Sequence, residues 1–147
     1  MSDSPGKGRA AARTLNRPSS INRSISARWT KRIAQQGFTP VATVFLVAYA
    51  QLAAAQGQRG LNSTEALLII HIVSFKWDER DPFPRIKVLA ERMGLTPRSV
   101  RNTLKCLEER GLVKRVRLPN DIANRYDMSG LFLALEAWID GQKAVAA

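Results

Sequence analysis

The stretch LAERMGLTPRSVRNTLKCLEERGLVKRVRL, residues 89–118, determines the fold that we expect for this chain. Its first part predicts a short helix that ends at Gly94, because glycine is favoured just after the last turn of a helix. Thr96 and Pro97 predict the start of a second helix, since a threonine hydroxyl caps a helix and proline fits its first turn. Apolar residues then recur at helical spacing until Gly111 ends the helix. We therefore expect two helices joined by a tight turn.

A β-hairpin is expected directly after the second helix. The segment LVKRVRL predicts a strand with Arg115 and Arg117 on its outer side, because alternate residues of a strand point to opposite faces. The turn-forming residues PND and a second short strand, NRYDM, complete the hairpin. This order of elements predicts a mainly α fold with a small β-hairpin wing, the winged helix-turn-helix.

The second helix, residues 97–110, carries a polar and basic face opposite its apolar residues. Arginine and asparagine on such a face suit base edges in a major groove, and basic side chains also suit phosphates. A basic outer face is equally typical of an ordinary solvated helix, so the order of the elements carries the prediction. The candidate DNA contacts are Arg98, Arg101, Asn102 and Lys105, together with Thr96 at the start of the helix.

The distribution of charge points to a polyanionic partner. The net charge is +11, from 23 basic and 12 acidic residues, which favours nucleic acid before a membrane surface. Residues 1–40 hold eight basic residues and one acidic residue. Residues 1–27 have almost nothing to bury and predict a disordered basic arm. Such an arm either contacts phosphates or a minor groove, or is a solubilising tail.

Nothing in the composition indicates an enzyme, a metal site or a cofactor. The chain has one cysteine, Cys106, which excludes an intrachain disulfide and fits a reducing compartment. We expect Cys106 to be a small core residue and His71, the one histidine, to be a core or interface residue. No cysteine and histidine cluster could hold zinc, and no glycine-rich phosphate loop is present. The acidic residues of the loop 78–81 are interrupted by Arg80, which indicates a solvated loop.

The chain is expected to have four regions. They are the arm over 1–27, an N-terminal helical extension over 28–60, the winged helix-turn-helix over 61–128, and a C-terminal helix and tail over 129–147. Thr39 and Pro40 predict the start of a helix that runs to about Gln56. One residue of 62–64 is expected to cap the next helix, with Glu65 near its positive end.

Two of the expected helices are strongly apolar. The segment Val41–Ala55 spans 15 residues, short of the ~20 that a membrane helix needs. The N-terminus lacks the apolar run of a signal peptide, so we expect a cytoplasmic, nucleoid-associated protein without membrane contact. The helix over 129–140 carries a wide apolar stripe that either packs onto the domain or forms a dimer interface. The two helices, 41–56 and 129–140, together favour a homodimer.

From about Gly37 to Trp138 the sequence resembles the winged helix-turn-helix domains of bacterial, phage and plasmid transcriptional regulators and replication initiators. The phrases LAERMGLTPRSVRNTLKCLEERGLVKR and NRYDMSGLFLALEAW carry most of this resemblance. It implies groove contacts from Arg98, Ser99, Arg101, Asn102 and Lys105, and wing contacts with phosphate or the minor groove from Arg115, Arg117 and Arg125.

Two departures from the family pattern bear on the site. Relatives often have serine or threonine where Arg85 stands, so the cap of that helix comes from elsewhere or Arg85 contacts phosphate. The wing tip PNDIA is short and contains Asp121, which disfavours deep contact with a minor groove. Asn124 and Tyr126 are expected to shape the hairpin rather than to contact DNA.

The expected function is that of a non-enzymatic, sequence-specific double-stranded DNA-binding protein, first of all a transcriptional regulator. Two alternatives stay open, because this fold serves several functions. One is replication initiation or partition on a plasmid or mobile element, which direct repeats in the target would favour. The other is an adaptor whose winged helix binds protein, in which charge reversal on the second helix would leave the complex intact.

Overall fold

The computed structural model describes residues 24–52, 57–117 and 124–146, and the chain divides into two compact units, Met1–Phe38 and Thr39–Ala147. The described residues of the first unit contain the helices α2 (Ile25–Arg28) and α3 (Lys31–Ala34). Each begins at a hydroxyl cap, because Ser24 accepts a hydrogen bond from the Ala27 N–H and Thr30 accepts one from the Ile33 N–H. Neither helix contains a buried residue.

The first unit contains the expected arm and the beginning of the expected helical extension. Residues 1–23 of the expected arm lie outside the described residues, and the last residues of that arm are helical, since α2 begins at Ile25. The Ser24 cap supplies the local signal for this helix. The boundary between the units follows Phe38, whereas the sequence predicted boundaries after residues 27 and 60. The reason is that α4, assigned to the extension, packs within the second unit.

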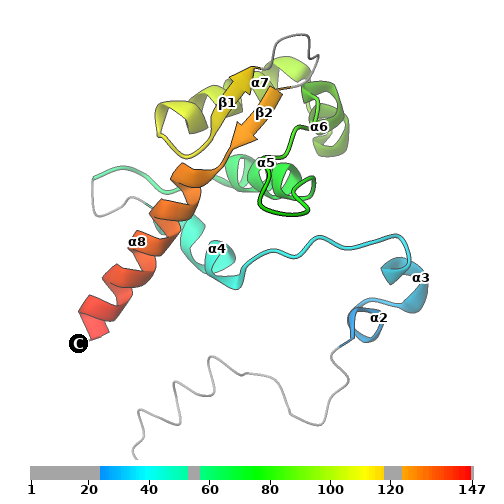
Figure 1. Cartoon of the computed structure of the whole chain (residues 1–147), viewed down its shortest axis with the longest axis horizontal. Helices are drawn as coiled ribbons and strands as arrows, with labels where there is room; N and C mark the ends of the chain where they lie inside the picture. Colours follow the sequence, from blue (N-terminus) through cyan, green and yellow to red (C-terminus); the bar gives the residue numbers. More distant parts are fainter. Residues whose placement is uncertain (1–23, 53–56, 118–123, 147) are drawn as a thin grey trace, which may run out of the picture. The chain divides into compact units, whose positions relative to one another are not determined.

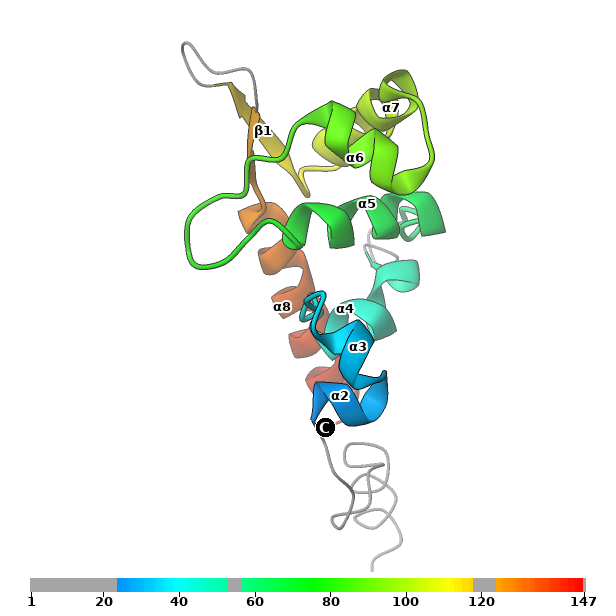
Figure 2. The same ribbon diagram turned by 90° about the vertical axis from the view of Figure 1, so that its right-hand side faces the viewer.

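The second unit contains α4 (Thr43–Ala48), the 3-10 helix η1 (Tyr49–Gln51), α5 (Ser63–Val73), α6 (Ile86–Met93), α7 (Pro97–Glu109), β1 (Lys114–Arg117), β2 (Asn124–Asp127) and α8 (Ser129–Ala146). Helices α5, α6 and α7 pack against one another, and the antiparallel β1–β2 hairpin lies beside α7 (Figure 1). Helix α8 leaves the hairpin and packs against α4 (Figure 2). This is the winged helix-turn-helix that the sequence predicted.

The turn between α6 and α7 forms as its local signals predict. Gly94 adopts a left-handed conformation with φ of 66°, which a residue without a side chain reaches at little cost. The Thr96 hydroxyl then accepts a hydrogen bond from the Ser99 N–H at 3.1 Å, and Pro97 occupies the first turn of α7. These features set the direction in which α7 leaves α6.

Helix α4 is shorter than the helix predicted from Thr39 to about residue 56. It begins at Thr43 after Ala42, which makes no side-chain cap, and it passes into η1 after Ala48. Residues 53–56 lie outside the described residues. Gly60 passes close to η1, since a Cβ there would lie 1.8 Å from the Ala50 carbonyl oxygen. That approach lies outside what local helix signals encode.

The core is built around α5 and the buried faces of the helices that pack on it. Fully or almost fully buried side chains come from α5, α6, α7, β2 and α8, so hairpin and helices share one core. They include Leu68, Ile69 and Ile72 of α5, Leu89 of α6, Val100, Leu104 and Leu107 of α7, Tyr126 of β2, and Leu131 of α8. Burying each such side chain stabilises the fold by about 1.5–3 kcal/mol. The core therefore determines which face of α7 remains exposed.

Candidate nucleic-acid interface

Helix α7 presents four of the nine predicted DNA contacts on one exposed surface. Its opposite face is formed by the buried residues Val100, Leu104 and Leu107. The exposed side chains are Arg98, Arg101, Asn102 and Lys105. Positions 98, 102 and 105 follow one another at helical spacing and so lie on one face of the helix. We call these four residues the α7 basic face.

The two hydroxyl residues at the start of α7 hold the helix end. Thr96 caps the helix through the Ser99 N–H, and its hydroxyl donates a hydrogen bond to the Ser99 Oγ at 3.0 Å. The Thr103 hydroxyl donates to the Ser99 carbonyl oxygen one turn further on. The exposed Thr96 and the half-buried Ser99 thus both have a structural role in the cap. Their contact with DNA stays a prediction.

The hairpin places Arg115 differently from the predicted outer side. Arg115 pairs across the strands with Tyr126, which is fully buried, so both side chains lie on the same face of the hairpin. The Arg115 guanidinium forms an ion pair with Glu108 of α7, with an Nη2–Oε1 distance of 2.6 Å. Because side chains alternate along a strand, Arg115 and Arg117 are predicted to share a face of the hairpin. Tyr126 lies on that face and is buried, so the face points toward the core. Arg117, at the end of β1, remains exposed.

Arg125 lies on the other face of the hairpin, where its partner across the strands is Val116. It is half-buried, and its Nε–H has no hydrogen-bond partner among the described residues, which omit the wing tip at 118–123. The predictions about that tip, including Asp121, fall outside the described residues. On its second edge β2 contacts the loop before α6, because the Tyr126 N–H donates to the Pro82 carbonyl oxygen at 2.9 Å. Strand β2 is therefore hydrogen-bonded to β1 on one edge and to the loop before α6 on the other.

Helix α6 begins without a side-chain cap. Arg85 occupies the cap position, is exposed and makes no side-chain capping hydrogen bond. The Arg85 carbonyl oxygen accepts the Leu89 N–H, but the Arg85 side chain satisfies none of the free N–H groups of the first turn. Contact of Arg85 with phosphate, the second possibility raised by the sequence, stays a prediction.

The sequence predicted that Cys106 lies in the core and that His71 lies in the core or at an interface. Cys106 is exposed, so the expectation of a core residue is wrong. The apolar face of α7 is defined by positions 100, 104 and 107, and position 106 points away from it at helical spacing. His71 is half-buried on α5. Its burial lowers the pKa of the imidazole, and the nearby charge of Arg92 lowers it further.

The acidic residues between α5 and α6 form a solvated loop. Asp78 forms an ion pair with Arg80 at 2.7 Å, and hydrogen bonds from Arg80 lower the pKa of Asp78 to about 2. In the part of the chain that the structure describes, no group of three or more His, Cys, Asp or Glu residues could hold a metal ion. Likewise, none of the described helices is long and apolar enough to cross a membrane.

Comparison with known proteins identifies the segment that contains α5, α6 and α7. Residues 59–113 match a family described as a helix-turn-helix domain. No curated protein matches the sequence. Among solved structures, the crystal structure of a transcriptional regulator of the MarR family from Rhodococcus sp. RHA1 is similar, with 22% identity and a TM-score of 0.39. The similarity covers 82% of this chain and 80% of that chain.

Proposed function

We propose that this protein binds double-stranded DNA sequence-specifically and regulates transcription, because residues 59–113 match a helix-turn-helix domain family. The observation that carries the proposal is the α7 basic face. It combines fork-shaped arginine donors, an asparagine amide and a lysine on one exposed surface of a helix whose other side is buried. These are the side-chain types that distinguish base pairs in a major groove.

The proposed mechanism has a sequence-specific part and an electrostatic part. Helix α7 lies in the major groove, where Arg98 or Arg101 contacts guanine and Asn102 contacts adenine through paired hydrogen bonds. Lys105, Thr96 and Ser99 contact phosphates or base edges near the ends of this surface. The wing and the basic N-terminal region neutralise further phosphates and release counterions, which strengthens binding at low salt.

Within the wing, the arginines are not equivalent candidates. Arg117 is exposed and its side chain is not paired with any described residue, whereas Arg115 would have to share its guanidinium between phosphate and Glu108. Arg125 is half-buried at the base of the wing. We therefore propose Arg117 as the main wing contact, with Arg115 and Arg125 as secondary contacts.

We also propose that two copies of the chain form a homodimer through α4 and α8. These helices pack together and leave apolar side chains exposed, with Leu46 53%, Val47 58% and Phe132 41% exposed. Contiguous exposed apolar residues often mark a protein–protein interface. A two-fold dimer would present two α7 helices to an inverted repeat with half-sites about one helical turn apart.

Selection and sequencing of random duplex DNA, bound by the full chain at about 150 mM salt, tests the proposed function. We expect enrichment of an inverted repeat. Enriched direct repeats would instead favour replication initiation or partition. Salt-sensitive binding without enrichment would contradict a sequence-specific function and favour the protein-interaction adaptor, which charge reversal on α7 would then test.

Arg101→Ala is expected to weaken discrimination at one base-pair position by about 5- to 150-fold, the range expected for one paired hydrogen-bond contact to a base. The measurement is competitive binding to the selected site and to variants of it at each position. Lys143→Ala is the matched control, because Lys143 is an exposed residue of α8 and its loss removes the same charge. Equal losses on selected and random DNA would contradict a base contact by Arg101.

Deletion of residues 1–23 removes five basic side chains and leaves α2 intact. We expect a flatter dependence of log affinity on log salt, by about 0.9 for each phosphate that the shortened chain no longer neutralises. The selected sequence should stay the same, because phosphate contacts carry no direct sequence information. A changed consensus would indicate base contacts by the N-terminal region, and an unchanged slope would indicate that this region makes no phosphate contacts.

A further inference from the structure

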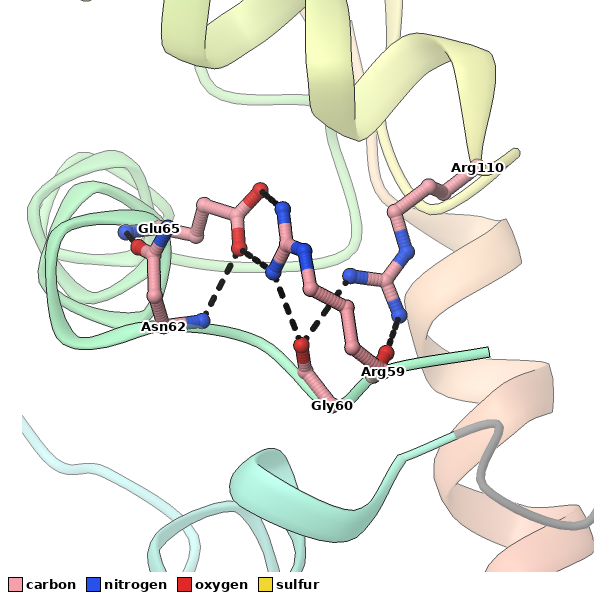
Figure 3. Close-up of polar contacts among 5 residues, drawn as sticks. All are labelled: Arg59, Gly60, Asn62, Glu65 and Arg110. Carbon is pink, nitrogen blue, oxygen red and sulfur yellow. Dashed lines mark hydrogen bonds and ion pairs between the residues drawn. The ribbon is translucent and has the colours of Figure 1, made fainter. Parts of the chain in front are cut away.

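An ionic cluster around the buried Glu65 carboxylate connects the start of α5 with the end of α7 (Figure 3). Its members are Arg59, Gly60, Asn62, Glu65 and Arg110, which we call the Glu65 cluster. The Glu65 side chain is 2% exposed. Its carboxylate accepts two hydrogen bonds from the Arg59 guanidinium, at 2.7 and 3.0 Å, and one from the Asn62 N–H at 2.9 Å. The buried charge is thus fully paired, as a carboxylate in a core requires.

Arg110 connects this cluster to the α7 basic face. It is the C-cap residue of α7, and its backbone N–H donates to the Cys106 carbonyl oxygen. Its guanidinium donates to the carbonyl oxygens of Arg59 and Gly60 (Figure 3). The side chain of Arg59 is held by Glu65, so the carbonyls that anchor Arg110 are themselves fixed. The end of α7 therefore depends on the Glu65 carboxylate through Arg59.

The segment that carries these carbonyls also contacts η1. The Leu61 N–H donates to the Tyr49 carbonyl oxygen at 2.8 Å. Gly60 passes so close to η1 that a Cβ there would lie 1.8 Å from the Ala50 carbonyl oxygen. Residues 59–61 are consequently held by η1, by α5 and by α7 together. A change at Glu65 or Arg110 would release one of these three attachments.

We propose that Glu65 and Arg110 are positioning residues, which set the direction of α7 so that its base-contacting side chains meet their partners. This inference rests on the proposed function of α7. Hydrogen bonds to bases require donor–acceptor distances near 2.7–3.2 Å, so a small rotation of the helix weakens them. Attraction between flexible cations and phosphates is long-ranged and tolerates the same rotation. Loss of the contacts in the Glu65 cluster should therefore reduce the discrimination between selected and random DNA more than it reduces the affinity for random DNA.

Glu65→Gln tests the proposal, with Glu79→Gln as its matched control. Both changes remove one negative charge, but Glu79 is exposed in the loop between α5 and α6. We expect Glu65→Gln to lower the ratio of affinities for selected and random DNA about tenfold, roughly one good base contact. The control should leave the ratio within about twofold of the wild type. If the wild type prefers its selected sequence, an unchanged ratio in Glu65→Gln, or an equal loss of both affinities, would overturn the proposal.

A second pair of variants keeps the test decisive if Glu65→Gln does not fold. Arg110→Gln should lower the same ratio, and Arg110→Lys should restore part of it, because an ammonium can still donate to a carbonyl. Lys143→Gln matches the loss of charge on an exposed residue of α8. A ratio for Arg110→Gln equal to that of Lys143→Gln would contradict the positioning role.

Hydrogen exchange separates failure of this inference from failure of the proposed function. Faster exchange confined to residues 106–112 in a folded Arg110→Gln variant would support positioning of α7, even if the wild type shows no sequence preference. In that case the proposed function fails and the positioning role stands. Unchanged exchange at these residues, together with an unchanged DNA preference, overturns the positioning role alone.

Discussion

Leu104→Ala is expected to lower the free energy of unfolding by about 2–5 kcal/mol. Leu104 is fully buried on the side of α7 opposite its basic face, and α7 packs there against α5 and α6. Truncation removes the transfer free energy of the side chain and leaves a cavity that rigid neighbouring helices close only in part. The measurement is urea unfolding followed by circular dichroism.

Leu67→Ala is the control for this prediction, because it makes the same chemical change on α5 at a residue that is 45% exposed. We expect a change within about 0.5 kcal/mol, as for most surface substitutions. A similar loss of stability in both variants would contradict the assignment of Leu104 to the core. It would also weaken the assignment of Arg101 and Lys105 to the exposed surface, since the two faces of α7 are determined together.

Gly130→Ala is expected to destabilise the protein by about 3 kcal/mol, the upper end for overpacking. A Cβ at this position would lie 1.8 Å from the Gly111 carbonyl oxygen, which belongs to the backbone and so cannot swing aside. The close approach is fixed by the Leu131 N–H, which donates to the Leu112 carbonyl oxygen at 2.9 Å. Helix α8 therefore begins directly against the segment that follows α7.

Gly141→Ala provides a control of opposite sign in the same helix. Gly141 is exposed, and a Cβ there would meet nothing within 4 Å. Replacing a glycine with alanine in the interior of an exposed helix should raise the free energy of unfolding by about 0.8–1.0 kcal/mol. Urea unfolding of both variants measures the difference. A neutral Gly130→Ala would mean that α8 and the end of α7 are not in close contact, and would contradict the described packing.

Features of this protein that depend on neighbours in the chain could be predicted from the sequence. The turn between α6 and α7 follows from Gly94, Thr96 and Pro97, each of which acts on its own backbone or on an N–H three residues away. The two faces of α7 follow from the helical period, which needs no knowledge of what the apolar face contacts. The winged helix-turn-helix and its exposed basic helix are determined at this local level.

Tertiary structure alone decided the features that depend on residues far apart. The period of β1 predicts a shared face for Arg115 and Arg117, but only the burial of Tyr126 against the core decides which way that face points. The contact of Arg110 with the Arg59 carbonyl joins residues 51 positions apart, and Gly60 passes directly beside η1. Charge and periodicity describe a residue and its near neighbours, whereas these contacts exist only after the helices pack. The sequence by itself thus determined the helix that we propose contacts DNA, and the tertiary structure determined what holds that helix in place.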